Sequence, residues 1–175
     1  MPIVLDVGRD AAPQSIDGFE PFDDAGVLYA FHLYEPWEHV TWRVNQGRVP
    51  YGSQAWSRAD LEAALAHVDR WRDKWGVPAS RIFAAEIGCD RRIPGVEAYL
   101  DDALTLIEAR RYHWAFFGYR EDSWDAYDYE LGSRPLTEAE HEIYARGRAL
   151  DLPRPGGAAF DVIQTHLSKV SAPRQ

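Results

Sequence analysis

The sequence predicts an α/β protein built on a parallel β-sheet. Four short apolar runs have the composition of strands, and none shows the polar–apolar alternation of a half-exposed sheet. Near-continuous apolar runs are typical of strands that are covered on both faces. Helical patterns lie between several of these runs, which favours right-handed βαβ units. The predicted strands are Ile3–Val7, Val27–Leu33, Arg81–Ile87 and His113–Tyr119.

The clearest helix lies between the second and third predicted strands. Apolar residues from Leu61 to Trp75 repeat at helical spacing and share one face over about four turns. Ser57 or Asp60 is suited to cap its start, and Gly76 ends it. The other predicted helices are a short one at Asp17–Phe22, one opened by Pro94 with its inner face running from Val96 to Ile107, one at Thr137–Leu150 with Thr137 and Glu140 spaced as a capping box, and one at Phe160–Leu167.

Composition narrows the classes of partner. The 175 residues include 28 acidic and 19 basic side chains, a formal net charge of −9. This balance argues against a nucleic acid or an anionic membrane as partner. The single cysteine, Cys89, excludes an internal disulfide and a cysteine-based zinc cluster. Seven Trp, nine Tyr and seven Phe are more than a core of this size needs, and such aromatic surfaces suit sugar ligands.

The length predicts one domain over residues 1–170, followed by a frayed tail at 171–175. No secretory signal opens the chain, and no apolar run approaches the roughly 18 residues of a membrane span. We therefore expect a cytoplasmic protein if the printed chain is complete, and a secreted or periplasmic one if its front end is missing. No glycine-rich phosphate loop or nucleophile elbow is present, and we expect no cofactor and no bound metal.

Reactive side chains gather where the predicted strands end, which is where parallel α/β folds place their sites. The second strand is followed by Tyr34 and Glu35 and carries His32 near its end. The third carries Glu86 inside an apolar run. The fourth run ends in Arg120, Glu121 and Asp122.

Each of these residues also has a purely structural interpretation. A carboxylate such as Glu86 in apolar surroundings must be paired or hydrogen-bonded, and an arginine partner would serve structure alone. His32 fits a satisfied core histidine, and Tyr34 fits ordinary packing. Glu35 and His39 are spaced for a metal, but Pro36 interrupts a helix there and no third ligand follows at regular spacing. Trp37, Trp42 and Trp56 could anchor loops rather than stack on sugars.

Taken together, three segments are more specific than any one residue. HLYEPWEHVTWRVNQG, then AAEIG, then WAFFGYREDSWDAYDYELG resemble, in order, the second half of a glycoside hydrolase family 5 catalytic domain, a cellulase-like family of retaining β-glycosidases. The resemblance runs from Ile3 to about Leu167. It implies a partial (β/α)8 TIM barrel of about four βα units, corresponding to strands five to eight. A whole barrel needs about 250 residues.

The resemblance also implies roles. Glu86 matches the nucleophile after strand seven, and Tyr34 would donate a hydrogen bond that orients it. His32 would orient the acid/base group or the substrate. The residues expected to bind the carbohydrate substrate are Trp114, Phe117, Trp124, Trp37 and Glu35. Phe117 stands where the family usually has a large aromatic residue or a histidine. Its ring can still stack on a sugar, but it has no polar group for a hydrogen bond to the sugar.

The family's acid/base glutamate, which follows an asparagine after strand four, has no counterpart here. A retaining β-glycosidase needs two carboxyl groups, so we expect a truncated or split enzyme that carries the nucleophile and is inactive alone. The alternative is a non-catalytic carbohydrate-binding or complementation half-barrel. Open strand edges predict either a separate N-terminal half-barrel as partner or self-association.

Overall fold

The structure, a computed structural model, describes residues 1–120 and 124–171. Its centre is one four-stranded sheet in the order β1-β2-β3-β4, and every adjacent pair is parallel. This confirms the predicted parallel α/β class. The strands are β1 (Ile3–Asp6), β2 (Val27–Leu33), β3 (Ile82–Ile87) and β4 (His113–Trp114).

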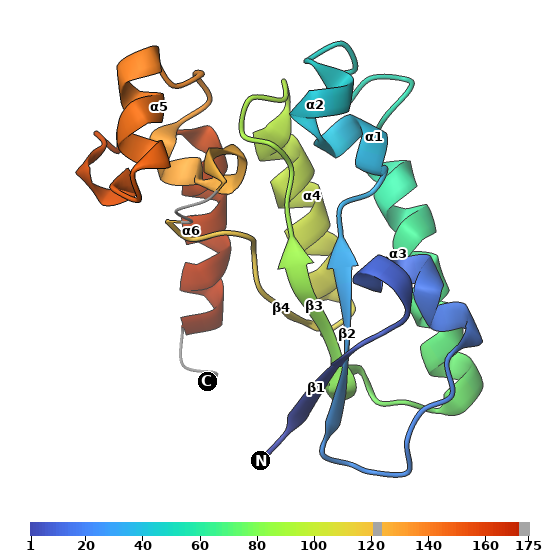
Figure 1. Cartoon of the computed structure of the whole chain (residues 1–175). Helices are drawn as coiled ribbons and strands as arrows, with labels where there is room; N and C mark the ends of the chain where they lie inside the picture. The colour runs from blue at the N-terminus through green and yellow to red at the C-terminus, as the bar shows by residue number, and fades with distance from the viewer. Residues whose placement is uncertain (121–123, 172–175) are drawn as a thin grey trace.

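Helices flank the sheet, and two short helices lie in the connection that follows β2. Figure 1 shows α1 and α2 beyond the arrowheads of β2 and β3, and α6 to one side of the strands next to α5. The described α-helices are α1 (Trp37–Val40), α2 (Trp42–Asn45), α3 (Arg58–Trp75), α4 (Val96–Ala109), α5 (Glu138–Ala145) and α6 (Ala158–Ser171). Short 3-10 turns complete the chain: η1 (Arg9–Ala11), η2 (Pro13–Gly18), η3 (Ala79–Arg81), η4 (Asp125–Tyr127), η5 (Tyr129–Leu131) and η6 (Ala149–Asp151). No helix in the described ranges is long and apolar enough to cross a membrane.

The main core forms between one face of the sheet and helices α3 and α4. Phe31 and Leu33 of β2 are fully buried there, together with Leu65 of α3 and Leu104 of α4. The helix α3 begins as the sequence predicts, since Ser57 and Asp60 form a reciprocal capping box and Gly76 ends the helix in the left-handed conformation. A second, smaller cluster around α5 packs Leu131, Leu136, Tyr144, Ala149 and Leu152 together.

Several predicted boundaries are wrong. The fourth strand ends at Trp114 rather than Tyr119, although the backbone N–H groups of Ala115 and Phe117 still donate to β3 carbonyls, at 2.9 and 3.0 Å. Pro94 lies before the helix it was expected to open, because Gly95 is the N-cap of α4.

The remaining boundary errors concern short helices. The predicted helix at Asp17–Phe22 is the 3-10 turn η2, which begins earlier, at Pro13. The capping box at Thr137 is present, but α5 ends at Ala145 instead of continuing to Leu150. Helices α1 and α2 were not predicted. The last helix, α6, is longer than the predicted Phe160–Leu167 and includes Ser171, which was expected to begin the tail. Glu121 and Asp122 of the fourth predicted run, and residues 172–175 of the predicted tail, lie outside the described residues.

Candidate active site

A shift in the pairing of β2 with β3 brings the key side chains together. Phe31 pairs with Ala84, but the next residue, His32, pairs with Glu86, so Ala85 is skipped. With unbroken alternation, Glu86 would share the buried, helix-facing side of β3 with Ala84. The extra residue turns Glu86 to the opposite face, beside His32. Such irregularities re-aim side chains next to functional sites.

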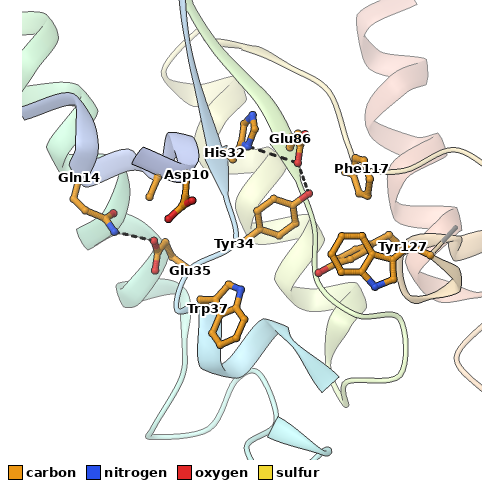
Figure 2. Close-up of a pocket in the computed structure, with 11 residues that line it drawn as sticks. Asp10, Gln14, His32, Tyr34, Glu35, Trp37, Glu86, Phe117 and Tyr127 are labelled. Atoms are coloured by element: carbon orange, nitrogen blue, oxygen red, sulfur yellow. Dashed lines mark hydrogen bonds and ion pairs between the residues drawn. The ribbon is translucent and has the colours of Figure 1, made fainter. Parts of the chain in front are cut away.

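Glu86 lies beside the two residues that the family resemblance implied would act with it. The Tyr34 hydroxyl donates a hydrogen bond of 2.7 Å to Oε2 of Glu86, and Nδ1 of His32 lies 3.6 Å from the same oxygen. His32 and Tyr34 are two residues apart along β2 and its exit, so both point to the same face. Figure 2 shows the two side chains converging on Glu86.

This environment bears on the two interpretations of Glu86 that the sequence left open. Within the described part of the chain no arginine forms an ion pair with Glu86, and its side chain is 33% exposed. The carboxylate is therefore partly exposed, while one of its oxygens is held by Tyr34. His32 is less exposed than Glu86, and it contacts charged groups on both sides rather than apolar core.

The protonation state of Tyr34 is well defined. Burial, followed by the hydrogen bond to Glu86 and the negative charge of that residue, raises the pKa of the Tyr34 hydroxyl far above its usual value. The hydroxyl therefore keeps its proton over the whole physiological range. It can act only as a donor toward the carboxylate, which orients one oxygen and leaves the other available.

A third strand also contributes to the charge arrangement. Oδ1 of Asp6, at the end of β1, lies 3.5 Å from Nε2 of His32. The imidazole of His32 thus stands between two carboxylates, one on each neighbouring strand. Both distances, 3.5 and 3.6 Å, are long for hydrogen bonds.

These residues open into a pocket at the carboxyl ends of the strands. The pocket has a volume of about 670 Å³ and is lined by Asp10, Ala12, Gln14, His32, Tyr34, Glu35, Trp37, Glu86, Phe117, Trp124 and Tyr127. The side-chain amide of Gln14 donates a hydrogen bond of 3.1 Å to Oε1 of Glu35 at one end of the pocket (Figure 2). A polar wall therefore faces the side that holds Glu86.

Aromatic rings form the remaining wall. Phe117, Trp124 and Tyr127 contact one another edge-to-face, with ring centroids 5.4 to 6.4 Å apart, and Tyr127 contacts Tyr34 at 5.8 Å. Trp124 is 57% exposed and Trp37 56%. Large exposed indole surfaces beside polar groups are suited to stacking on the apolar faces of sugar rings.

Gly88 permits this close packing. A Cβ at position 88 would lie 2.6 Å from Cε1 of Tyr34 and 3.0 Å from two atoms of the Tyr127 ring. Both rings therefore approach the backbone after β3 at a distance that only glycine allows. The position of the Tyr34 hydroxyl on Glu86 depends on this small residue.

Buried polar contacts fix the loop that carries the aromatic wall. The Arg91 side chain is 1% exposed. It donates two hydrogen bonds to Asp125, one to the backbone carbonyl and one to the carboxylate, both of 2.7 Å. It also donates to the carbonyls of Gly132 and Arg134. The Tyr129 hydroxyl bonds both the N–H and the carbonyl of Cys89, at 3.1 and 3.0 Å. The segment after β3 thereby anchors the segment after β4.

Most of the residues predicted to form the site do line one pocket. The structure brings together Glu86, Tyr34, His32, Phe117, Trp124, Trp37 and Glu35. Trp114 is the exception. It pairs with Ala84 on the helix-facing side of the sheet and packs against the main core, so its side chain does not reach the pocket. Trp56, for which the sequence allowed a loop-anchoring role, is fully buried among His39, Tyr51 and Tyr99.

Sequence reasoning missed four residues that line the pocket, which are Asp10, Ala12, Gln14 and Tyr127. Asp10 and Gln14 lie in the turns that follow β1, and Tyr127 lies beyond β4. The rule that functional residues follow parallel strands applies to β1 as well, and that rule was the available signal for Asp10 and Gln14. In the described ranges, no group of three or more His, Cys, Asp or Glu side chains is arranged to hold a metal ion.

Comparison with known proteins gives a result for the fold only. No family model matches the chain, and no curated protein matches it by sequence. Solved structures do match. An endoglucanase superimposes with a TM-score of 0.61 at 15% identity, over 84% of this chain and 47% of that one. Cellulose synthase subunit Z from Clostridioides difficile gives 0.60 at 16% identity, over 86% and 49%.

A third match is endoglucanase Cel5A from Thermotoga maritima, with a TM-score of 0.60 at 13% identity, over 85% of this chain and 47% of that one. The chain therefore spans about half the length of the structures it resembles. At these identities the likeness establishes architecture rather than chemistry. The protein has a cellulase-like α/β fold that corresponds to part of a (β/α)8 barrel.

Proposed function

We propose that the chain is the nucleophile-bearing half of a retaining β-glycosidase of the family 5 type, acting on a β-linked glycan or glycoside. The observation that carries the proposal is the Glu86 carboxylate, held at one oxygen by Tyr34 and open to an aromatic-lined pocket at the carboxyl ends of the strands. The endoglucanase-like architecture supports the same function.

The proposed chemistry assigns a defined task to each residue. In the first step an oxygen of Glu86 bonds to the anomeric carbon of the sugar, and the bond from that carbon to the leaving oxygen breaks. The Tyr34 hydroxyl orients the attacking carboxylate, and His32 orients the acid/base group or the substrate. Trp37, Phe117 and Trp124 provide surfaces for the sugar rings. A retaining mechanism also needs a second carboxyl group about 5–5.5 Å away, which protonates the leaving group and then activates water.

The catalytic acid follows an asparagine after strand four in the family, in a part of the barrel that has no counterpart in this chain. General acid–base catalysis contributes roughly 10²- to 10⁴-fold. We therefore expect the isolated chain to hydrolyse unactivated aryl β-glycosides negligibly. A leaving group that departs as a stable anion needs no proton, and so it allows the nucleophile to be tested separately.

The test uses 2,4-dinitrophenyl 2-deoxy-2-fluoro-β-cellobioside and the corresponding mannobioside. We expect stoichiometric release of dinitrophenolate, with the bonding electrons leaving on its oxygen, and a glycosyl ester on the peptide containing Glu86 in the mass spectrum. Glu86→Gln abolishes the label. The matched change Glu62→Gln, on an exposed residue of α3 that pairs with Arg58, leaves it intact.

Tyr34→Phe sharpens the assignment. A hydrogen bond to a charged group is worth about 1.5–3 kcal/mol, so labelling should slow by roughly 10- to 100-fold. Labelling of Glu35 or Asp10 in place of Glu86, or no labelling with either sugar, would contradict the proposal.

The aromatic pocket supports a second candidate, a carbohydrate-binding half-barrel without catalysis. Four of its lining residues, Trp37, Phe117, Trp124 and Tyr127, provide ring surface regardless of any reaction. Calorimetry with cello- and manno-oligosaccharides separates the two functions. Binding with no covalent label on Glu86 favours the second candidate.

A further inference from the structure

The aromatic wall of the pocket rests on a segment that lies beyond the sheet. Trp124 and Tyr127 come after Phe117, whose N–H donates to β3. The turn between the two rings has a backbone bond of 3.4 Å, from the N–H of Tyr127 to the carbonyl of Trp124. This distance is long for a hydrogen bond, so we expect side-chain contacts to contribute to the position of the wall.

Arg154 supplies such contacts from another part of the chain. It lies in the connector between η6 and α6, and its Nη1 donates to both carboxylate oxygens of Asp128, at 2.7 Å each. Its Nη2 donates to the carbonyl of Ala149 at 3.0 Å. The side chains of Arg154 and Asp128 are 12% and 1% exposed. A buried ion pair of this kind holds its two segments together, because either charge left alone at this depth would be costly.

Glu130 extends this contact to the start of the segment. Nε and Nη2 of Arg120 donate to its carboxylate at 2.6 and 3.1 Å, and Nη1 of Arg154 donates to Oε2 at 3.3 Å. The N–H of Gly156, from the same connector as Arg154, donates to the backbone carbonyl of Glu130 at 2.9 Å. The Arg120 guanidinium, followed by that of Arg154, lowers the pKa of Glu130. The carboxylate therefore stays charged at neutral pH and joins the two guanidinium groups.

We call these four residues, Arg120, Asp128, Glu130 and Arg154, the charge clamp. None of the four is among the residues that line the pocket, whereas Trp124, between Arg120 and Asp128 in the sequence, does line it. The charge clamp is thus placed to act on a ligand only through the rings of the aromatic wall.

We propose that Arg154 is a positioning residue of the pocket. Through Asp128 and Glu130 it sets the place of the aromatic wall and thereby the affinity for a sugar, whereas the Glu86 carboxylate is held from β2 by Tyr34. The inference rests on the proposed function for the identity of the ligand as a carbohydrate. Arginine suits this task, because a planar guanidinium can face a carboxylate and a backbone carbonyl at once, and a lysine ammonium is a point charge.

A purely structural role is the alternative. Ala149, which accepts a hydrogen bond from Arg154, belongs to the second hydrophobic cluster around α5. In that case Arg154 would stabilise this cluster and leave the rings of the wall in place. The two roles differ in what happens to Trp124 when the guanidinium is removed.

The experiment labels residues 1–175 with fluorotryptophan and follows the fluorine NMR resonances, each assigned by replacing its tryptophan with phenylalanine. Trp37 lies on α1, outside the charge clamp, and serves as the internal reference. In Arg154→Gln we expect the Trp124 resonance to shift or broaden and the Trp37 resonance to stay. The matched variant Arg148→Gln, which changes an exposed arginine that pairs with Asp151, should leave both resonances unchanged.

Sugar binding provides the second readout. Calorimetry with cello- and manno-oligosaccharides should give an affinity roughly five- to tenfold lower for Arg154→Gln, which is the size of effect expected when one stacking ring is lost. The maximal rate at which dinitrophenyl glycosides label Glu86 should be unchanged, while the reagent concentration that gives half of that rate rises. Arg154→Lys keeps the charge that faces Asp128 and should restore part of the affinity. It also serves as the test variant if Arg154→Gln does not fold.

Arg154 is not a positioning residue if either the Trp124 resonance or the sugar affinity is unchanged in Arg154→Gln. The proposal is also wrong if the resonances of Trp124 and Trp37 move together, if the maximal labelling rate falls as much as the affinity, or if Arg148→Gln has the same effects. A parent chain that binds neither sugar contradicts the proposed function alone, because the Trp124 resonance still decides whether Arg154 positions the wall.

Discussion

In the part of the chain that the structure describes, strands β2 and β3 each pair with two strands, whereas β1 and β4 each pair with one. The inner strands are longer, and residues such as Phe31, Leu33 and Ile87 are fully buried. The outer strands have four and two residues, and Ile3 and Val4 remain half exposed. His32 and Glu86 belong to this inner pair, and Tyr34 follows directly after β2.

This difference shows how the molecule divides its tasks. The inner strands contribute most of the sheet's buried side chains to the main core, and such packing is suited to holding the Glu86 carboxylate in a defined orientation. The outer strands contribute less packing and leave apolar surface available. One small sheet therefore has both a well-packed centre, which positions Glu86, and exposed apolar side chains on β1.

The largest expected effect contrasts the two regions in stability. Phe31→Ala on β2 removes a fully buried ring, which should lower the free energy of unfolding by about 3–5 kcal/mol. Ile3→Ala on β1 removes a side chain that is already half in water, and should change it by no more than about 0.5 kcal/mol. Urea denaturation measures both. Equal losses would mean that β1 is as well packed as β2, contrary to the comparison.

A substitution at Gly88, with an intermediate expected effect on the free energy of unfolding, tests how Tyr34 is positioned. Gly88→Ala forces Tyr34 and Tyr127 away from the backbone, and overpacking of this kind costs about 1–3 kcal/mol. If the clash with Tyr34 is the cause, the same change should cost much less in a Tyr34→Ala background. A double-mutant cycle measured by urea denaturation gives the coupling between the two positions. Simple additivity would show that Gly88 acts elsewhere.

The smallest effect lies at the periphery, in α5. The Arg134 guanidinium, together with the backbone N–H of Thr137, lowers the pKa of Glu140 to about 2 from the usual 4.5. A lowered pKa means that the stabilising contribution is present above about pH 4.5 and is lost as the pH falls toward 2. Amide exchange should show α5 loosening over this range while β2 and β3 remain protected. Glu140→Gln should remove this pH dependence, whereas Glu142→Gln on the same helix should retain it.

Much of the fold was predictable because it follows from local patterns. The positions of the four strands, the long helix α3 with its capping box and the parallel direction all depend on nearby residues and on apolar periodicity. Boundaries were less predictable. Helix α5 ends early and β4 stops at Trp114, because the neighbours that would prolong an element are not visible from its own sequence.

The candidate site divides in the same manner. The residue types at the strand ends singled out Glu86, Tyr34 and His32 one by one, and the family resemblance implied that they act together. The same reasoning misplaced Trp114, since the face on which it lies depends on pairing with Ala84. It also passed over Gln14 and Tyr127, whose positions depend on turns after β1 and β4.

The linear sequence was enough to determine the α/β class and the chemical character of the pocket, because hydrophobic period, capping residues and functional groups are properties of short segments. Only the tertiary structure decided that Glu86 faces His32 and Tyr34. That outcome depends on a one-residue shift between β2 and β3, and a register is set by the packing of both strands against α3 and α4 rather than by either strand alone.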